Sequence, residues 1–92
     1  MNYLERRAKA EKEITKVAGL TAASMGIDVY SAVETCLCDI EQCSIYESYL
    51  INSISFEDFS EEIGPRIEEK IVSMSHVEKQ GLVSTVLGLI YR

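Results

Sequence analysis

Five times in 92 residues, a Ser or Asn is followed three positions later by Glu or Asp. At a helix start, this spacing lets the first side chain accept a backbone N–H bond while the acidic side chain bonds back to the capping residue. The five candidate starts are Asn2, Ser31, Ser44, Ser55 and Ser75. Apolar residues recur between them every three or four positions, a period typical of amphipathic helices. The sequence therefore predicts an all-α fold, a compact bundle of five or six helices, two of them long, in a single domain over residues 1–92.

The ends of the predicted helices follow from glycine, proline and a shift in the apolar pattern. The predicted helices cover residues 2–25, about 28–43, 44–52, 55–64, 65–74 and 75–91, with a strand over residues 82–91 as an alternative at the end. Gly26 can supply the positive φ that often ends a helix. Gly64 is expected to end another helix, because Pro65 suits the first turn of a new one. The second helix begins near either Asp28 or Ser31.

Charged residues on the predicted first helix fall in two places. One apolar stripe contains Tyr3, Ala10, Ile14, Val17, Ala18, Thr21, Ala22 and Met25. Glu13 lies on the opposite, polar side, whereas Arg7 and Glu11 fall on the stripe itself. Either these two residues pair at i,i+4 beyond the core, or they form a charged anchor at an interface. We favour the pair.

Charge is distributed unevenly along the chain. Residues 17–65 contain no Lys or Arg but nine acidic residues, and the whole chain carries a formal net charge of −6. Residues 1–16 hold five basic and three acidic residues, a net +2, whereas residues 17–92 hold four basic and twelve acidic residues, a net −8. A field of this sign repels nucleic acid and anionic lipid and attracts basic protein surfaces. We therefore expect a basic protein partner, no nucleic-acid partner and no membrane association.

No motif in the sequence indicates a catalytic site, a metal site or a cofactor. Cys36, Cys38 and Cys43 lack the paired spacing of zinc ligands, and on a helix Cys38 points away from the other two. Three thiols without an export signal indicate a reducing cytoplasm and no disulfide. The longest apolar run, residues 81–91, falls short of the ~18 residues that a membrane-spanning helix needs. His76 has no neighbour in sequence that would orient it for catalysis.

Acidic and aromatic residues form the candidate partner-binding site. The candidate residues are Glu41, Tyr46, Glu47, Tyr49, Glu57, Asp58, Glu61 and Glu62. Their negative charge would speed association with a basic surface and exclude an anionic competitor. Tyr46 and Tyr49 either give a partner a large contact area or turn inward because the helix phase shifts at Ser44. Both interpretations of the two rings stay open.

These observations favour a small cytoplasmic protein-binding module over an enzyme. The specific hypothesis is an inhibitor of the immunity type, which masks a basic active-site or nucleic-acid-binding surface of a partner such as a toxin or a nuclease. One alternative is a self-assembling or chaperone-like helical subunit, for example a homodimer. It would pair with a copy of itself or with a secreted client through the apolar side chains within residues 46–51. Another alternative is a small-ligand-binding bundle in which Lys9, Lys12 or Lys16 meets an anionic group.

Overall fold

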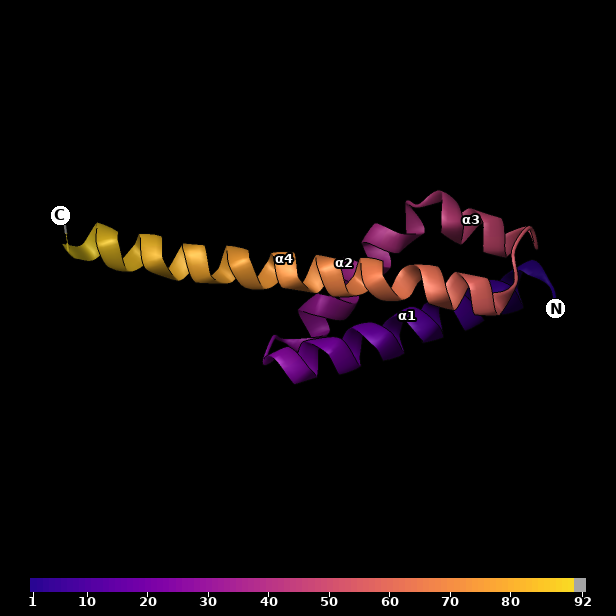
Figure 1. The fold of residues 1–92 in the computed structure, drawn as a ribbon, viewed down its shortest axis with the longest axis horizontal. Helices are drawn as coiled ribbons and strands as arrows, with labels where there is room; N and C mark the ends of the chain where they lie inside the picture. Colours follow the sequence, from indigo (N-terminus) through magenta and orange to yellow (C-terminus); the bar gives the residue numbers. More distant parts are fainter. Residues whose placement is uncertain (91–92) are drawn as a thin grey trace.

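The computed structural model describes the backbone of residues 1–90 and the side chains of residues 1–75. Residues 1–90 form four helices and no strand (Figure 1): α1 (Tyr3–Met25), α2 (Val29–Glu41), α3 (Ser44–Leu50) and α4 (Phe56–Ile90). The all-α prediction is confirmed. Helix α1 has 23 residues, close to the predicted first helix, whereas the 35-residue α4 replaces three predicted helices. The predicted number of five or six helices is wrong.

The first two helices begin at polar side chains that cap the backbone. The Asn2 side chain accepts a 2.8 Å hydrogen bond from the amide of Glu5, as its spacing predicts. At α2 the Asp28 carboxylate accepts a 2.9 Å bond from the amide of Ser31, so the helix starts at the earlier of the two predicted positions. Gly26 ends α1 in the left-handed conformation, with a φ of 71°. A residue with a Cβ would be strained there.

Helix α4 is where the sequence prediction fails. Gly64 and Pro65 do not end a helix, and no new helix starts at Ser75, because α4 runs without a break from Phe56 to Ile90. The apolar stripe continues across the proline, with Phe59, Ile63, Ile67 and Ile71 all buried at spacings of four residues. Burying each isoleucine contributes about 1.5–3 kcal/mol, which offsets the ~3 kcal/mol cost of an interior proline.

The residue before the proline makes the continuous helix easier to form. A side chain at this position would normally clash with the proline ring in helical geometry, but Gly64 has no Cβ. The strand alternative near the end of the chain is also wrong, because residues 82–90 belong to α4. Tyr91 and the side chains after residue 75 lie outside what the structure describes. They include the apolar side chains that the sequence pattern predicts to be buried by the last helix, Leu82, Val83, Val86, Leu87, Leu89 and Ile90.

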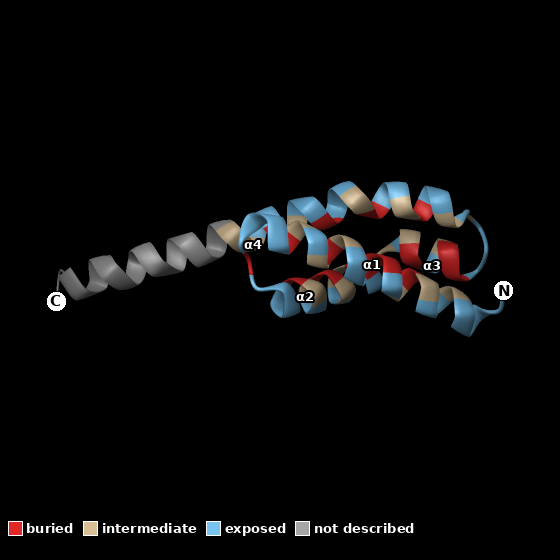
Figure 2. Cartoon of the chain, turned by 90° about the horizontal axis from the view of Figure 1, so that it is seen from below, coloured by how far each residue is buried: buried red, intermediate tan, exposed pale blue. Residues whose placement is uncertain are grey.

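The core lies where the four helices face one another (Figure 2). The buried apolar residues are Ala10, Ile14, Ala18, Ala22, Ile27, Ala32, Cys36, Ile40, Tyr46, Tyr49, Leu50, Phe59, Ile63, Ile67 and Ile71. The alanines of α1 are small, which allows neighbouring helices to approach closely. Tyr3 and Met25, at the two ends of the predicted stripe, are instead 50% and 39% exposed. They lie in the first and last turns of α1.

Two acidic residues of α1 behave differently from each other. Arg7 and Glu11 pair at 3.4 Å on the surface, which confirms the favoured interpretation. Glu13 is not on a solvated face as predicted, since it is buried and forms a 3.1 Å ion pair with Lys16. The reason is that α1 packs against all three of the other helices, so more of its circumference is covered than one stripe predicts.

Candidate functional site

Three of the predicted acidic residues line one groove. Asp58, Glu61 and Glu62 project from α4 beside Ile45, Ile54 and Pro65, around a groove of about 600 Å³ between α3 and α4. We call this the α3–α4 groove. Ile45 comes from the first turn of α3, and Ile54 comes from the connection to α4. The structure thus combines an apolar surface with a carboxylate rim.

The carboxylates of the α3–α4 groove have no neutralising partner among the described side chains. The ion pairs among the side chains of residues 1–75 join Arg7 to Glu11, Lys16 to Glu13 and Arg66 to Asp39, and none of them involves a carboxylate of this groove. The remaining predicted acids, Glu41, Glu47 and Glu57, are exposed but do not line this groove. Among the described side chains, negative charge and apolar surface therefore meet at residues 58–62.

The two candidate tyrosines face the core. Tyr49 is 1% exposed and stacks on Phe59, with 4.9 Å between ring centres, and it also packs against Phe56. Tyr46 is buried as well. These positions agree with the interpretation that the phase shift at Ser44 turns both rings inward. In this conformation neither ring presents contact area to a partner.

Two basic side chains of α1 contact the end of α3 and the start of α4. The Nε of Arg6 donates a 2.8 Å hydrogen bond to the carbonyl oxygen of Tyr49, and the same guanidinium lies 4.6 Å from the Tyr49 ring centre. The Nζ of Lys9 lies 4.1 Å from the ring centre of Phe56. Sequence reasoning missed these contacts. The sequence feature that indicates these contacts is the cluster of Lys and Arg residues just before the lysine-free stretch.

The hydroxyl of Tyr46 has an unusual position. It is buried and finds no hydrogen-bond partner among the described residues. Burial raises the pKa of Tyr46, and the nearby carboxylates of Glu11 and Glu41 raise it further, while Arg7 acts in the opposite direction. An unpaired buried hydroxyl costs about 1–3 kcal/mol.

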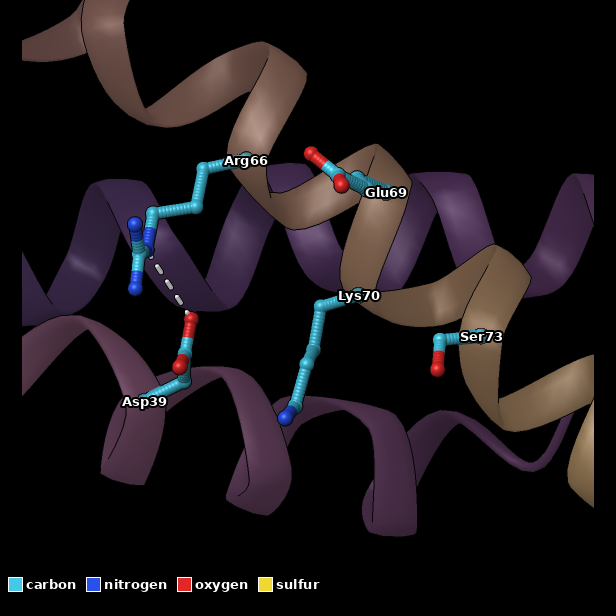
Figure 3. Close-up of a pocket in the computed structure, with 5 residues that line it drawn as sticks. All are labelled: Asp39, Arg66, Glu69, Lys70 and Ser73. Carbon is cyan, nitrogen blue, oxygen red and sulfur yellow. Dashed lines mark hydrogen bonds and ion pairs between the residues drawn. The ribbon is translucent and has the colours of Figure 1, made fainter.

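A second groove lies between α2 and α4, and the sequence did not reveal it. It has a volume of about 240 Å³ and is lined by Asp39, Arg66, Glu69, Lys70 and Ser73 (Figure 3). We call it the α2–α4 groove. The Nε of Arg66 donates a 3.1 Å hydrogen bond to the Asp39 carboxylate, which raises the pKa of Arg66. The first base after the lysine-free stretch thus ties α4 to α2.

The three thiols lie as the helix geometry predicts. Cys36 is buried, Cys43 is partly buried and Cys38 is exposed, and all three are free thiols. Burial raises the pKa of Cys36. A buried thiol with a raised pKa is a poor nucleophile, because the thiolate is the reactive form. Among the described side chains, no three of the types His, Cys, Asp and Glu lie close enough to share a metal ion.

Comparison with known proteins adds no relative. No protein-family model, no curated protein and no solved structure matches the chain. Within the described part of the chain, no helix combines the length and apolar character needed to cross a bilayer. The α3–α4 groove is the place where predicted site residues and an apolar surface meet.

Proposed function

We propose that this protein is a protein-binding module whose α3–α4 groove receives a basic segment of a partner protein. The observation that carries the proposal is that the carboxylates of Asp58, Glu61 and Glu62, which form no ion pair among the described side chains, line one groove with Ile45, Ile54 and Pro65. Lys and Arg side chains match both features, since they have apolar stems and charged ends. A partner segment would place its stems on Ile45 and Ile54 and its charges at the rim.

The charge of the groove would act mainly on association and on competition. Exposed charges raise the rate of encounter with an oppositely charged surface more than they raise final affinity. When the carboxylates of the groove bind a basic surface of the partner, they would also exclude an anionic substrate from that surface. Inhibition of the immunity type, within the cytoplasm, is the form of binding that uses both effects.

The two alternative functions find less support in the contacts. Lys9 lies over Phe56 and Lys16 pairs with Glu13, so two of the three lysines offered to an anionic ligand already have partners. Of the apolar residues offered to a second copy or a client, Tyr46, Tyr49 and Leu50 are buried in the protein's own core, and Ile51 is exposed. Most of that apolar surface is therefore already covered.

A peptide titration followed by NMR tests the proposal. The probes are a basic amphipathic peptide of Lys and Leu and a matched acidic peptide in which Glu replaces each Lys. We expect the basic peptide alone to shift the backbone amides of residues 45, 54 and 58–62, with saturation. Equal shifts with both peptides, or shifts spread evenly over the surface, would contradict the proposal.

A matched pair of variants separates the groove from general charge. One variant neutralises the rim with Asp58→Asn, Glu61→Gln and Glu62→Gln, and the control neutralises three exposed acids elsewhere with Glu5→Gln, Glu34→Gln and Glu68→Gln. Both variants lose the same amount of negative charge. We expect the rim variant to lose binding of the basic peptide, whereas the control variant retains most of it. Light scattering during the titration shows whether self-association contributes.

A further inference from the structure

We infer that the basic segment received by the α3–α4 groove is the outer side of α1 from a second copy of this chain. This inference rests on the proposed function, because it names the partner at the same groove. Three exposed residues of α1 carry it, namely Lys12, Lys16 and Leu20. We call them the α1 row. They combine two basic side chains with an apolar one, which is the chemistry that the groove accepts.

The α1 row lies on the side of α1 that faces away from the core. The buried residues Ala10, Ile14, Ala18 and Ala22 recur every four positions, and each member of the row lies midway between two of them. Two positions correspond to ~200° around a helix, so the row occupies the opposite side. The buried side of α1 packs against the other three helices. The row of one copy can therefore meet the groove of another copy but not its own.

The side chains of the α1 row are available for a contact. Leu20 is 68% exposed. Lys12 is exposed and forms no ion pair with any side chain in residues 1–75. Lys16 pairs with Glu13, but its side chain stays 65% exposed. Because an ammonium group has three N–H donors, Lys16 can contact a second carboxylate without leaving the first.

Charge complementarity favours a second copy as the occupant of the groove. Residues 1–16 carry a net +2, whereas residues 17–92 carry a net −8. Each copy thus has a basic row and an acidic groove whose carboxylates form no ion pair among the described side chains. The net charge of −6 makes two copies repel each other at long range. At about 0.15 M salt the screening length is ~8 Å, so charges in direct contact outweigh the distant ones.

The dimensions of the two surfaces agree. From Lys12 to Leu20 the row is ~12 Å long, and the groove residues from Asp58 to Pro65 span ~10 Å of α4. A row laid along the groove places its two ammonium groups at the carboxylates and Leu20 beside the apolar lining. Because the two surfaces differ, the contact is heterologous and joins copies head to tail.

Two complementary variants test this contact. The rim variant carries Asp58→Asn, Glu61→Gln and Glu62→Gln, and the row variant carries Lys12→Gln and Leu20→Ser. Light scattering at about 0.15 M salt, with protein from about 10 μM to about 1 mM, measures association. We expect the mass of the wild type to rise with concentration, and each variant alone to associate at least about tenfold more weakly. An equimolar mixture should form a 1:1 complex and no larger species, because it keeps one intact row and one intact groove.

Isotope labelling of one variant at a time locates the contact in this mixture. The labelled row variant should show shifts of the backbone amides of residues 45, 54 and 58–62, and the labelled rim variant should show shifts over residues 12–20. Net charge alone predicts a different result. The rim variant has a formal net charge of −3 against −6 for the wild type, so weaker repulsion would make it associate more strongly.

The outcomes separate the two proposals. A wild type that stays monomeric, variants that associate as the wild type does, or a mixture without a 1:1 complex would overturn the inference. If the Lys and Leu peptide still shifts the groove amides, only the identity of the partner is wrong. If that peptide shifts nothing either, both proposals fail.

A control variant and a stability measurement complete the test. The control variant with Glu5→Gln, Glu34→Gln and Glu68→Gln has the same net charge as the rim variant and should associate at least as strongly as the wild type. All the replaced side chains are exposed, so thermal unfolding should be nearly unchanged in each variant. Weaker association of the control variant would contradict the assignment to the groove.

Discussion

The guanidinium of Arg6 lies 4.6 Å from the centre of the Tyr49 ring and donates a 2.8 Å hydrogen bond to the carbonyl oxygen of the same residue. Tyr49 in turn stacks on Phe59 of α4. One cation at the start of α1 therefore holds the end of α3 and, through the tyrosine ring, the first turns of α4. The basic cluster before the lysine-free stretch is in part a structural element.

Replacing Arg6 should destabilise the protein. We expect Arg6→Ala to lower the free energy of unfolding by about 1–3 kcal/mol, because a charged hydrogen bond and a cation–π contact are lost together. Urea unfolding followed by circular dichroism measures the change. Lys12→Ala removes the same charge from an exposed position and should change stability by less than about 0.5 kcal/mol. Equal effects of the two substitutions would show that the contacts with Tyr49 contribute nothing specific.

Removing the hydroxyl of Tyr46 should instead raise the free energy of unfolding. Tyr46→Phe keeps the buried ring and deletes a buried hydroxyl that has no hydrogen-bond partner among the described side chains. We expect the free energy of unfolding to rise by about 1–2 kcal/mol. Tyr30→Phe is the control, since the exposed hydroxyl of Tyr30 donates to Glu34 at 3.1 Å. That control should lose at most about 0.5 kcal/mol. A loss of stability in Tyr46→Phe would mean that the hydroxyl has a partner in solution.

The continuous helix across Pro65 predicts a non-additive pair of substitutions. Pro65→Ala should stabilise the protein by about 1–3 kcal/mol, because it restores a helical amide and removes the ring clash. Apart from the two neighbouring residues and the backbone of the same helix turns, no described heavy atom lies within 4 Å of a Cβ built on Gly64. Gly64→Ala should therefore add about 1 kcal/mol in the Pro65→Ala background, but should give no gain beside the proline, where the new Cβ meets the ring. Chemical unfolding of the four proteins measures this cycle, and additive effects would contradict the account of α4.

The sequence predicts the bounds of α1, α2 and α3 closely, but it predicts three helices where the structure has α4 alone. Capping and glycine signals are local, so Asn2 and Gly26 act in the structure as their sequence context predicts. Whether a helix stops at Gly64 and Pro65 depends on burial further along the chain, where Ile67 and Ile71 continue the stripe. Local signals cannot weigh that burial against the cost of the proline.

The candidate site was predictable in part for the same reason. The acidic residues Asp58, Glu61 and Glu62 could be named from charge alone, but their meeting with Ile45 and Ile54 depends on how α3 packs on α4. The direction of the Tyr46 and Tyr49 rings depended on where the helix phase changes, and two phases were possible from the sequence. Contacts between distant residues, such as that of Arg66 with Asp39, carry no local signal at all.

The buried thiol of Cys36 predicts a pH dependence in the alkaline range. Burial raises its pKa above the ordinary value of 9.0, so the folded and unfolded states are both protonated below pH 9. As the pH rises above 9, the unfolded state loses its proton first and is stabilised, and the free energy of unfolding falls. Unfolding curves from pH 8 upwards should show this fall in the wild type and in Cys38→Ala. Cys36→Ala should show a smaller fall, and an identical fall in all three proteins would contradict the assignment.

The central claim is that the rim of the α3–α4 groove attracts a basic segment. The most direct measurement is the stopped-flow association rate constant of the basic Lys and Leu peptide as the salt concentration rises from about 0.1 M to about 1 M, where the screening length falls from ~10 Å to ~3 Å. The test variants reverse three charges in the rim, with Asp58→Lys, Glu61→Lys and Glu62→Lys, or three elsewhere, with Glu5→Lys, Glu34→Lys and Glu68→Lys. Both variants bring the formal net charge from −6 to 0.

We predict that the rim reversal lowers the low-salt rate constant by about tenfold or more and abolishes its salt dependence. The control variant should keep most of the low-salt rate constant and most of its salt dependence, because its reversed charges lie outside the groove. Equal rate constants and equal salt slopes for the two variants would contradict the account, since they would show that net charge alone draws the peptide to the protein.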